Sequence, residues 1–255
     1  MTMCPDFRRK IPLVTASFWV MKITATTLGE TLGDFCSKDP DGLTWGYAKS
    51  TLILLPVLLV MLAWQLSRPG YRPFIFWSVV LATSTVGTTL ADLIDRTQGL
   101  GYGWGSALLV TLLAGVFAAW RLSGEPLSVD AVQSRLTESY YWAAIVISNT
   151  LGTALGDFMA KEAGKGGLGL EVGASTLLIA AILLLLLALG RFTRLSRVAL
   201  FWGAFILTRP FGANLGDFLA EEMKLGTTVV SGVLGAVLLG LVVRESAARA
   251  KDPAG

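Results

Sequence analysis

Four aspartates occupy the same position in a sequence motif that occurs four times in this 255-residue chain. In each copy an aromatic residue precedes a Trp, Gly follows ten residues after the Trp, Gly or Ala follows at fourteen, and Asp follows at fifteen. The four carboxylates are Asp34, Asp92, Asp157 and Asp217. The surrounding segments are apolar and long enough to cross a membrane, where an ionisable group is expensive and marks a functional site by default. We therefore take the four aspartates, with Glu30 one turn before Asp34, as candidate metal ligands.

Polar side chains accompany each aspartate at helical spacing. Positions seven, eleven and fifteen after each Trp are four residues apart and share one helix face. The supporting polar residues are Thr26, Ser84, Thr88, Asn149, Thr153 and Asn214. Two bases, Lys22 and Arg209, also lie in these segments. We expect these two bases to neutralise the charge of the intramembrane acids. Alternatively, Arg209 is a resident counter-charge that repels a substrate cation.

Small residues four apart stand directly before the aspartates. They are Gly29, Gly33, Gly87, Gly152, Gly156, Gly212 and Gly216, with Ala91 completing the second pair. Such small-xxx-small pairs let helix backbones approach closely, and this would bring the carboxylates together. A second interpretation is that each helix breaks at Gly-Asp and that the Asp caps a short following helix.

Composition indicates a membrane protein. Hydrophobic residues make up 53% of the chain and charged residues 15%, where a soluble domain has about 25% charged residues. Apolar stretches of bilayer length lie near 13–35, 46–66, 73–94, 103–121, 139–160, 172–190, 197–219 and 226–243. We therefore predict an all-α fold, a polytopic bundle of eight transmembrane helices forming a single domain over residues 1–255.

The repeats predict how these helices are arranged. Each unit consists of one polar-striped helix and one plain apolar helix, so two spans return the chain to the same side. The four units lie at approximately 11–70, 71–125, 135–195 and 196–245, and all cross the membrane in the same direction. Because no unit can bury its polar stripe alone, we expect the four striped helices to face one another.

Charge sets the orientation. Thirteen Lys and Arg residues lie on the side of the two termini and six on the opposite side, which places both termini in the cytoplasm. Cys4 and Cys36 then lie on opposite sides and form neither a disulfide nor a metal pair. The chain contains no His, so the commonest transition-metal ligand is missing.

Two resemblances add to this interpretation. The phrases TLGETLGDF, NTLGTALGDF and FGANLGDF, in a chain that is nearly all membrane segments, resemble a poorly characterised bacterial family known only as membrane-anchored proteins. That resemblance implies a multi-pass protein of the bacterial inner membrane. The segment Gly29–Asp34 is similar to the Glu-x-Gly-Asp signature of cation/proton exchangers, with one more residue between Glu and Gly. It implies metal binding by Glu30 and Asp34.

Oxygen ligands without His favour a hard cation. Carboxylate and hydroxyl oxygens suit Mn²⁺, Mg²⁺ or Ca²⁺, and clustered carboxylates cannot all stay ionised without a counter-charge. We therefore expect a secondary transporter that exchanges a divalent metal for protons. Its partners are the lipid bilayer, a small cation and protons, and not nucleic acid; it needs no cofactor, and the metal is its substrate.

Two other classes remain open, a cation channel and a non-transporting membrane scaffold or assembly protein. An intramembrane aspartyl protease would need two Asp on facing helices, and the chain matches its motifs only at Gly-Asp. We therefore expect no enzyme.

Overall fold

The computed structural model describes residues 10–128, 132, 134–193 and 195–251. Eight long α-helices follow one another: α1 (Ala16–Ser37), α2 (Tyr47–Ser67), α3 (Pro73–Asp92), α4 (Gly101–Leu122), α5 (Arg135–Ala160), α6 (Val172–Phe192), α7 (Arg197–Asp217) and α8 (Thr227–Lys251). Two helices continue into π-helical turns, α3 into η1 (Leu93–Thr97) and α7 into η4 (Phe218–Glu222), and a short 3-10 turn, η3 (Ala163–Lys165), follows α5. The predicted all-helical class is confirmed.

Several of these helices begin with a capping side chain or a proline. The side chains of Thr15, Ser134 and Ser196 accept hydrogen bonds from backbone N–H groups three residues later, at 3.4, 3.0 and 3.4 Å. Such caps satisfy donors that the first turn of a helix leaves unpaired. Pro73 stands in the first turn of α3, where its missing N–H is not needed.

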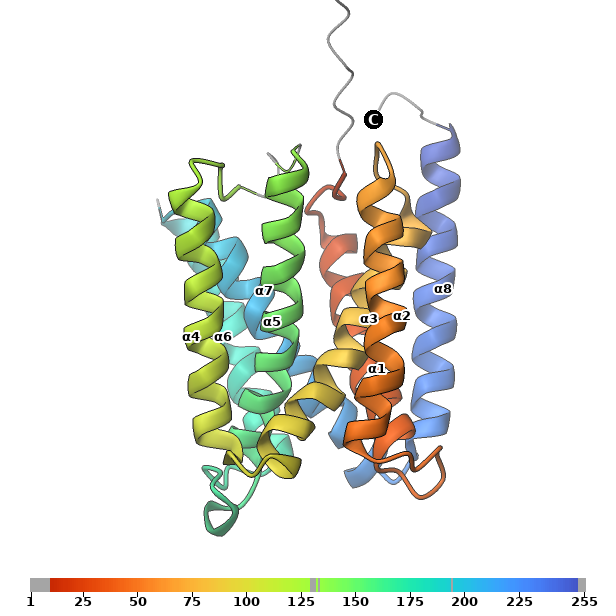
Figure 1. Ribbon diagram of the computed structural model, residues 1–255, viewed down its shortest axis with the longest axis vertical. Helices are drawn as coiled ribbons and strands as arrows, with labels where there is room; N and C mark the ends of the chain where they lie inside the picture. The colour runs from red at the N-terminus through yellow and green to blue at the C-terminus, as the bar shows by residue number, and fades with distance from the viewer. Residues whose placement is uncertain (1–9, 129–131, 133, 194, 252–255) are drawn as a thin grey trace, which may run out of the picture.

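The four striped helices form a closed ring. Helix α1 packs against α3 and α7, and α5 packs against the same two helices from the other side. Neighbours in the ring therefore come from consecutive repeats, and the first repeat adjoins the fourth. In Figure 1 these helices occupy the middle of the bundle, and α1 begins at the same end of the molecule at which α8 finishes.

The four plain helices surround this ring. Helix α2 packs chiefly on α3, α4 on α5, α6 on α7, and α8 on α1. Each outer helix thus covers the inner helix of the next repeat, and α8 closes the circle (Figure 1). Because each outer helix packs on the next repeat, every repeat is linked to its neighbour, and no repeat is a separate folding unit.

The outer surface is suited to lipid. Leu52, Leu177 and Leu187 on the outer helices are each more than 70% exposed. Within the described residues, seven helices are long and apolar enough to span a membrane. The remaining long helix, α1, carries Lys22, Glu30 and Asp34, all of which are buried in the bundle. The protein is therefore a membrane protein whose polar residues face inward.

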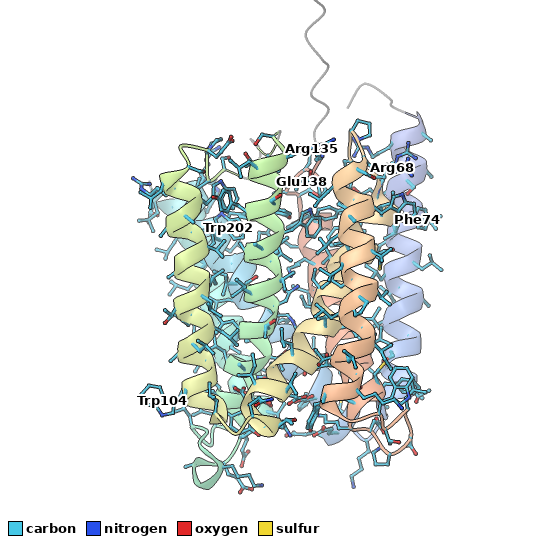
Figure 2. All side chains as sticks on the ribbon, in the orientation of Figure 1. Arg68, Phe74, Trp104, Arg135, Glu138 and Trp202 are labelled. Carbon is cyan, nitrogen blue, oxygen red and sulfur yellow. The ribbon has the colours of Figure 1, made fainter. Side chains whose placement is uncertain are left out.

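An aromatic ring joins the inner helices near the end where α1 begins. In every repeat the aromatic residue before the Trp contacts the Trp of the next repeat. The pairs and their centroid distances are Phe18–Trp77 5.7 Å, Phe76–Trp142 5.5 Å, Tyr141–Trp202 6.1 Å and Phe201–Trp19 5.8 Å. Figure 2 shows Trp202 and Glu138 towards this end and Trp104 at the other end. The repeated aromatic pairs therefore act as a closed packing belt inside the protein.

Glycines seat each inner helix on the next. Gly87 on α3 faces the α5 backbone, and a Cβ there would lie 2.9 Å from the carbonyl carbon of Asn149. The equivalent Gly29, Gly152 and Gly212 face Ser84, Arg209 and Thr26 with even less room. The glycine ten residues after one Trp thus packs on the residue seven after the next Trp. This repeated contact sets the spacing of the inner ring.

Candidate functional site

A buried ion pair occupies the middle of the inner ring. Arg209 Nη1 lies 2.9 Å from Glu30 Oε2, and Arg209 Nη2 donates to Thr88 Oγ1 at 2.7 Å and to the Ser84 carbonyl at 3.0 Å. Thr88 and Thr153 each donate to Glu30 Oε2 at 3.0 Å. All four inner helices therefore contribute to one hydrogen-bonded layer.

A second buried base lies closer to the belt of aromatic pairs. Lys22 Nζ donates to Asn149 Oδ1 at 3.2 Å and lies 4.2 Å from the centre of the Phe205 ring. The Asn149 amide in turn donates to Thr83 Oγ1 at 2.9 Å. Lys22 is fully buried, so its ammonium is held by an amide and an aromatic face.

The four aspartates form the next layer, towards the end of the bundle that carries Trp104. Arg96 links two of them, with Nε 2.7 Å from Asp92 and Nη2 2.9 Å from Asp157. Lys161 links the next two, with Nζ 3.6 Å from Asp157 and 3.8 Å from Asp217. Carboxylates and bases therefore alternate around this side of the ring, and each base bridges two consecutive repeats.

The junction between α7 and α1 differs. Among the described residues no base forms an ion pair with both Asp217 and Asp34, and the residue four after Asp217 is Glu221. Lys38 instead lies between Asp34, at 3.1 Å, and Glu221, at 3.7 Å. In the described part of the chain the alternation of charge thus breaks at two of the four junctions, α7–α1 and α1–α3, since Lys38 pairs with Glu221 and not with Asp92.

Three carboxylates converge at this junction. Glu30, Asp34 and Asp217 each offer one oxygen, and these oxygens lie within 4.8 Å of one another. The residues are only 3%, 3% and 6% exposed, which removes most of the water that would otherwise screen their charges. Asp34 Oδ1 is buried and accepts no hydrogen bond from the described residues. A cation placed among these oxygens would supply the missing partner.

A pocket leads to the same place. It has a volume of about 320 Å³ and lies between the end of α1, the η4 turn and the start of α8. Its lining residues include Asp34, Lys38, Asp39, Asp41, Glu221 and Thr227. Four of these six side chains are acidic, so the pocket favours cations, and Asp34 is the member of the carboxylate group that lines it.

The nearby bases at the helix ends are held in their charged form. Burial by itself lowers the pKa of Lys38, but Asp34, Asp217 and Asp92 outweigh it and raise that pKa well above its usual value. The pKa of Lys161 is likewise raised, because Asp157 and Asp217 outweigh the opposing effect of burial. Both ammonium groups therefore act as resident cations beside the carboxylates.

The predicted site residues lie mainly on the ring axis. Ser84, Thr88, Asn149 and Thr153 join the layers described above, and the Thr26 hydroxyl bonds to the Thr208 carbonyl of α7 at 3.3 Å. Asn214 lies elsewhere: its amide donates to Ser175 Oγ on α6 at 2.7 Å, so it holds an outer helix. Cys4 lies outside the described residues, and Cys36 is a free thiol near the end of α1.

The alternative of a broken helix with a capping Asp is wrong. Asp34 and Asp157 lie inside α1 and α5, which continue beyond them. Asp92 and Asp217 have α-helical backbone angles, and their side chains make no capping bond to the π-helical turns that follow. A π-turn lets the chain stay helical while it absorbs an extra residue, so no free N-terminus is created.

Lys38, Arg96 and Lys161 belong to the six bases counted on the side opposite the termini, and their ion pairs with the aspartates are not among the contacts expected from the sequence. A signal for them was present, since each follows its Asp by four residues, the spacing of an ion pair on one helix face. Glu221 has the same place in the fourth repeat. The repeated unit thus extends one turn beyond the aspartate.

Comparison with known proteins assigns the repeat. A family model described as a Repeat of Unknown Function (DUF347) matches four times, at residues 17–71, 75–125, 140–196 and 200–250. The chain has no significant match among curated proteins or among solved structures. Each matched segment contains most of one inner helix and all or nearly all of the outer helix that follows it. The four matches span most of the sequence, and the chain therefore belongs to the DUF347 repeat family.

Proposed function

We propose that this protein is a secondary transporter that exchanges a divalent cation of the Mn²⁺, Mg²⁺ or Ca²⁺ type for protons. The observation that carries the proposal is the buried group of Glu30, Asp34 and Asp217, whose oxygens converge within 4.8 Å and of which Asp34 also lines a pocket. Three oxygen ligands of this kind match the preference of hard cations. Waters and hydroxyl groups complete the coordination.

Charge balance favours a divalent ion. Among the described residues, the ring as a whole has five carboxylates and four bases paired with them, which leaves one negative charge; the acids are Glu30, Asp34, Asp92, Asp157 and Asp217, and the bases are Arg209, Lys38, Arg96 and Lys161. A divalent cation that displaces Lys38 from Asp34 makes the ring neutral. Glu221, 3.7 Å from Lys38 Nζ, offers the displaced ammonium a second partner.

Proton exchange follows from the same carboxylates. Closely spaced buried acids hold protons when no cation is present, and a bound metal releases them. The cation and the protons therefore compete for one site, which is the simplest coupling that a secondary transporter can use. The same proposal places the protein in the bacterial inner membrane with both termini in the cytoplasm, so the pocket opens to the outside.

A channel is less well supported than a transporter. Arg209 lies on the ring axis and is fixed by Glu30, Thr88 and Ser84, so a stream of cations would meet a buried positive charge. A carrier binds one ion at a time and tolerates such a charge, because the charge helps to expel the ion after a conformational change.

A non-transporting scaffold is the second candidate. The contacts of Arg96 with Asp92 and Asp157 favour it, since paired charges of this kind hold helices together without any substrate. A scaffold gives no role to the convergence of the Glu30, Asp34 and Asp217 oxygens, so cation binding at this group distinguishes the two candidates.

Flux measurements test the proposal. The purified protein, reconstituted in liposomes, should move Mn²⁺ in the direction opposite to the protons that an imposed pH gradient drives across the membrane. Asp34→Asn should abolish this flux. Asp41→Asn is the matched control, because Asp41 is exposed and lines the same pocket outside the carboxylate group. Absence of Mn²⁺ flux in the folded wild type would favour the scaffold, whereas unchanged flux in Asp34→Asn would rule out Asp34 as a ligand of the transported ion.

A further inference from the structure

The base four residues after each aspartate follows one rule. Arg96 contacts its own Asp92 and the Asp157 of the next repeat. Lys161 contacts its own Asp157 and the Asp217 of the next repeat. By this rule the residue at position 221 would bridge Asp217 and Asp34 with a positive charge.

Position 221 carries the opposite charge. Glu221 cannot bridge two carboxylates, and Lys38, which by the same rule would reach towards Asp92, turns to Glu221 instead. Among the described residues two junctions lack a bridging base, α7–α1 and α1–α3, and only the α7–α1 junction also holds the converging Glu30, Asp34 and Asp217 and the pocket. Four independent features therefore coincide at the α7–α1 junction: the inverted charge, the converging oxygens, the unpartnered Asp34 Oδ1 and the pocket.

We propose that Glu221 determines where the protein binds its cation, because it leaves out the side-chain base that fills the equivalent place at the α3–α5 and α5–α7 junctions. The external divalent cation takes the position that Arg96 and Lys161 occupy elsewhere in the ring. This inference rests on the proposed function, in that it assigns a determinant of the same site. It makes one junction the binding site, although all four repeats carry the aspartate.

The physical basis is competition between a tethered and a free cation. An ammonium on the chain is held beside its carboxylates at a very high effective concentration, which a dissolved ion must overcome. Where the base is present the carboxylates are already neutralised, and a metal gains little by binding. Where Glu221 replaces the base, Asp34 and Asp217 depend on Lys38 and Lys161, which they share with Glu221 and Asp157, so their charge is less fully neutralised. The acid also adds its own attraction at the pocket.

The test restores the missing base. Glu221→Lys in the full chain should weaken the binding of Mn²⁺, measured by calorimetric titration of the purified protein in detergent with MnCl2, by at least about tenfold. Glu222→Lys is the matched control, because it makes the same charge change on the neighbouring exposed residue of the same turn. It should change the dissociation constant less than about threefold, the size expected of a screened surface charge.

Thermal unfolding separates loss of binding from loss of folding. Without metal, Glu221→Lys should melt at a higher temperature than the wild type, because the new base pairs with Asp34 and Asp217. Addition of MnCl2 should raise the melting temperature of the wild type but hardly that of Glu221→Lys. A variant that merely fails to fold would melt lower. Glu221→Gln, which adds no base, should keep binding and lose only about threefold in affinity through the missing acid.

The outcomes are distinct. If the wild type binds no divalent cation, the proposed function and this inference both fall. If the wild type binds Mn²⁺ and Glu221→Lys binds it equally well, the role of Glu221 is overturned while the transporter proposal stands. Equal losses in Glu221→Lys and Glu222→Lys would also overturn it, since general surface charge would then explain both.

Discussion

Arg209 and Glu30 form an ion pair of 2.9 Å across 179 residues of sequence, with both side chains almost completely buried. The contact joins the first repeat to the fourth and closes the inner ring at mid-height. Removal of one partner from such a pair leaves an uncompensated buried charge, whereas removal of both is far less costly.

This relationship gives the first prediction. Arg209→Met keeps the stem that packs against Gly152 and should destabilise the protein by about 3–5 kcal/mol, because Glu30 is left buried without its partner. Adding Glu30→Gln should restore much of this loss. Thermal unfolding of the two variants in detergent measures the effect, and equal losses in both would contradict the prediction.

The same guanidinium should also affect ion release. In a variant that remains folded, Arg209→Met should bind Mn²⁺ about tenfold more tightly, because a positive charge beside the carboxylates has been removed. Release of Mn²⁺ from the loaded protein should slow accordingly, which stopped-flow mixing with a chelator can follow. Weaker binding in a folded Arg209→Met would show that the base organises the carboxylates and does not repel the ion.

The four aspartates should separate into two classes. Asp34→Asn and Asp217→Asn remove ligands from the converging group and should abolish Mn²⁺ binding. Asp92→Asn removes a partner of Arg96 and should retain binding within about threefold, while it lowers stability by about 1–3 kcal/mol. Calorimetric titration and thermal unfolding of all three variants check this, and equal loss of binding in all three would indicate one fourfold site.

Glycine packing gives a prediction that does not depend on function. Gly87→Ala places a Cβ 2.9 Å from the α5 backbone, which cannot move aside, and should cost about 1–3 kcal/mol. Gly115→Ala, on outer helix α4 with open space around it, should be neutral or stabilise the protein by up to about 1 kcal/mol. Melting temperatures of the two variants in the same detergent decide the matter, and similar values would contradict the observed helix contacts.

The raised pKa of Lys38 predicts how its contribution depends on pH. A base whose folded-state pKa lies above its unfolded value of about 10.4 stabilises the fold fully below that value and loses this effect only as pH rises through the folded pKa. Lys38→Gln should therefore lower the melting temperature by the same amount at every pH from about 6 to 9. If the difference between wild type and Lys38→Gln shrank steadily over this range, the ammonium would be titrating there.

Orientation in the membrane can be tested directly. A reporter that is active only outside the cytoplasm should remain inactive when fused to the C-terminus and become active when inserted at Asp41, in the turn between α1 and α2. The physical reason is the excess of basic residues on the side of the termini, thirteen against six. The opposite pattern would place the acidic pocket in the cytoplasm.

The sequence by itself determined the class of fold and the repeat. Long apolar stretches require helices, because backbone groups in lipid must satisfy one another, and the Trp-to-Asp spacing showed that four units are built alike. The spacing of Thr26, Glu30 and Asp34 also placed them on one face of one helix. These properties are local, since each follows from residues within a few turns.

Only the tertiary structure decided which repeats touch and which charges pair. Each inner helix is covered by the outer helix of the preceding repeat. This arrangement depends on contacts between repeats, and the periodicity within one repeat does not predict it. The turn of Lys38 towards Glu221 is likewise a contact between the first and fourth repeats. The sequence presented four equivalent aspartates, and the packing made them unequal because position 221 carries a negative charge where the second and third repeats carry a positive one.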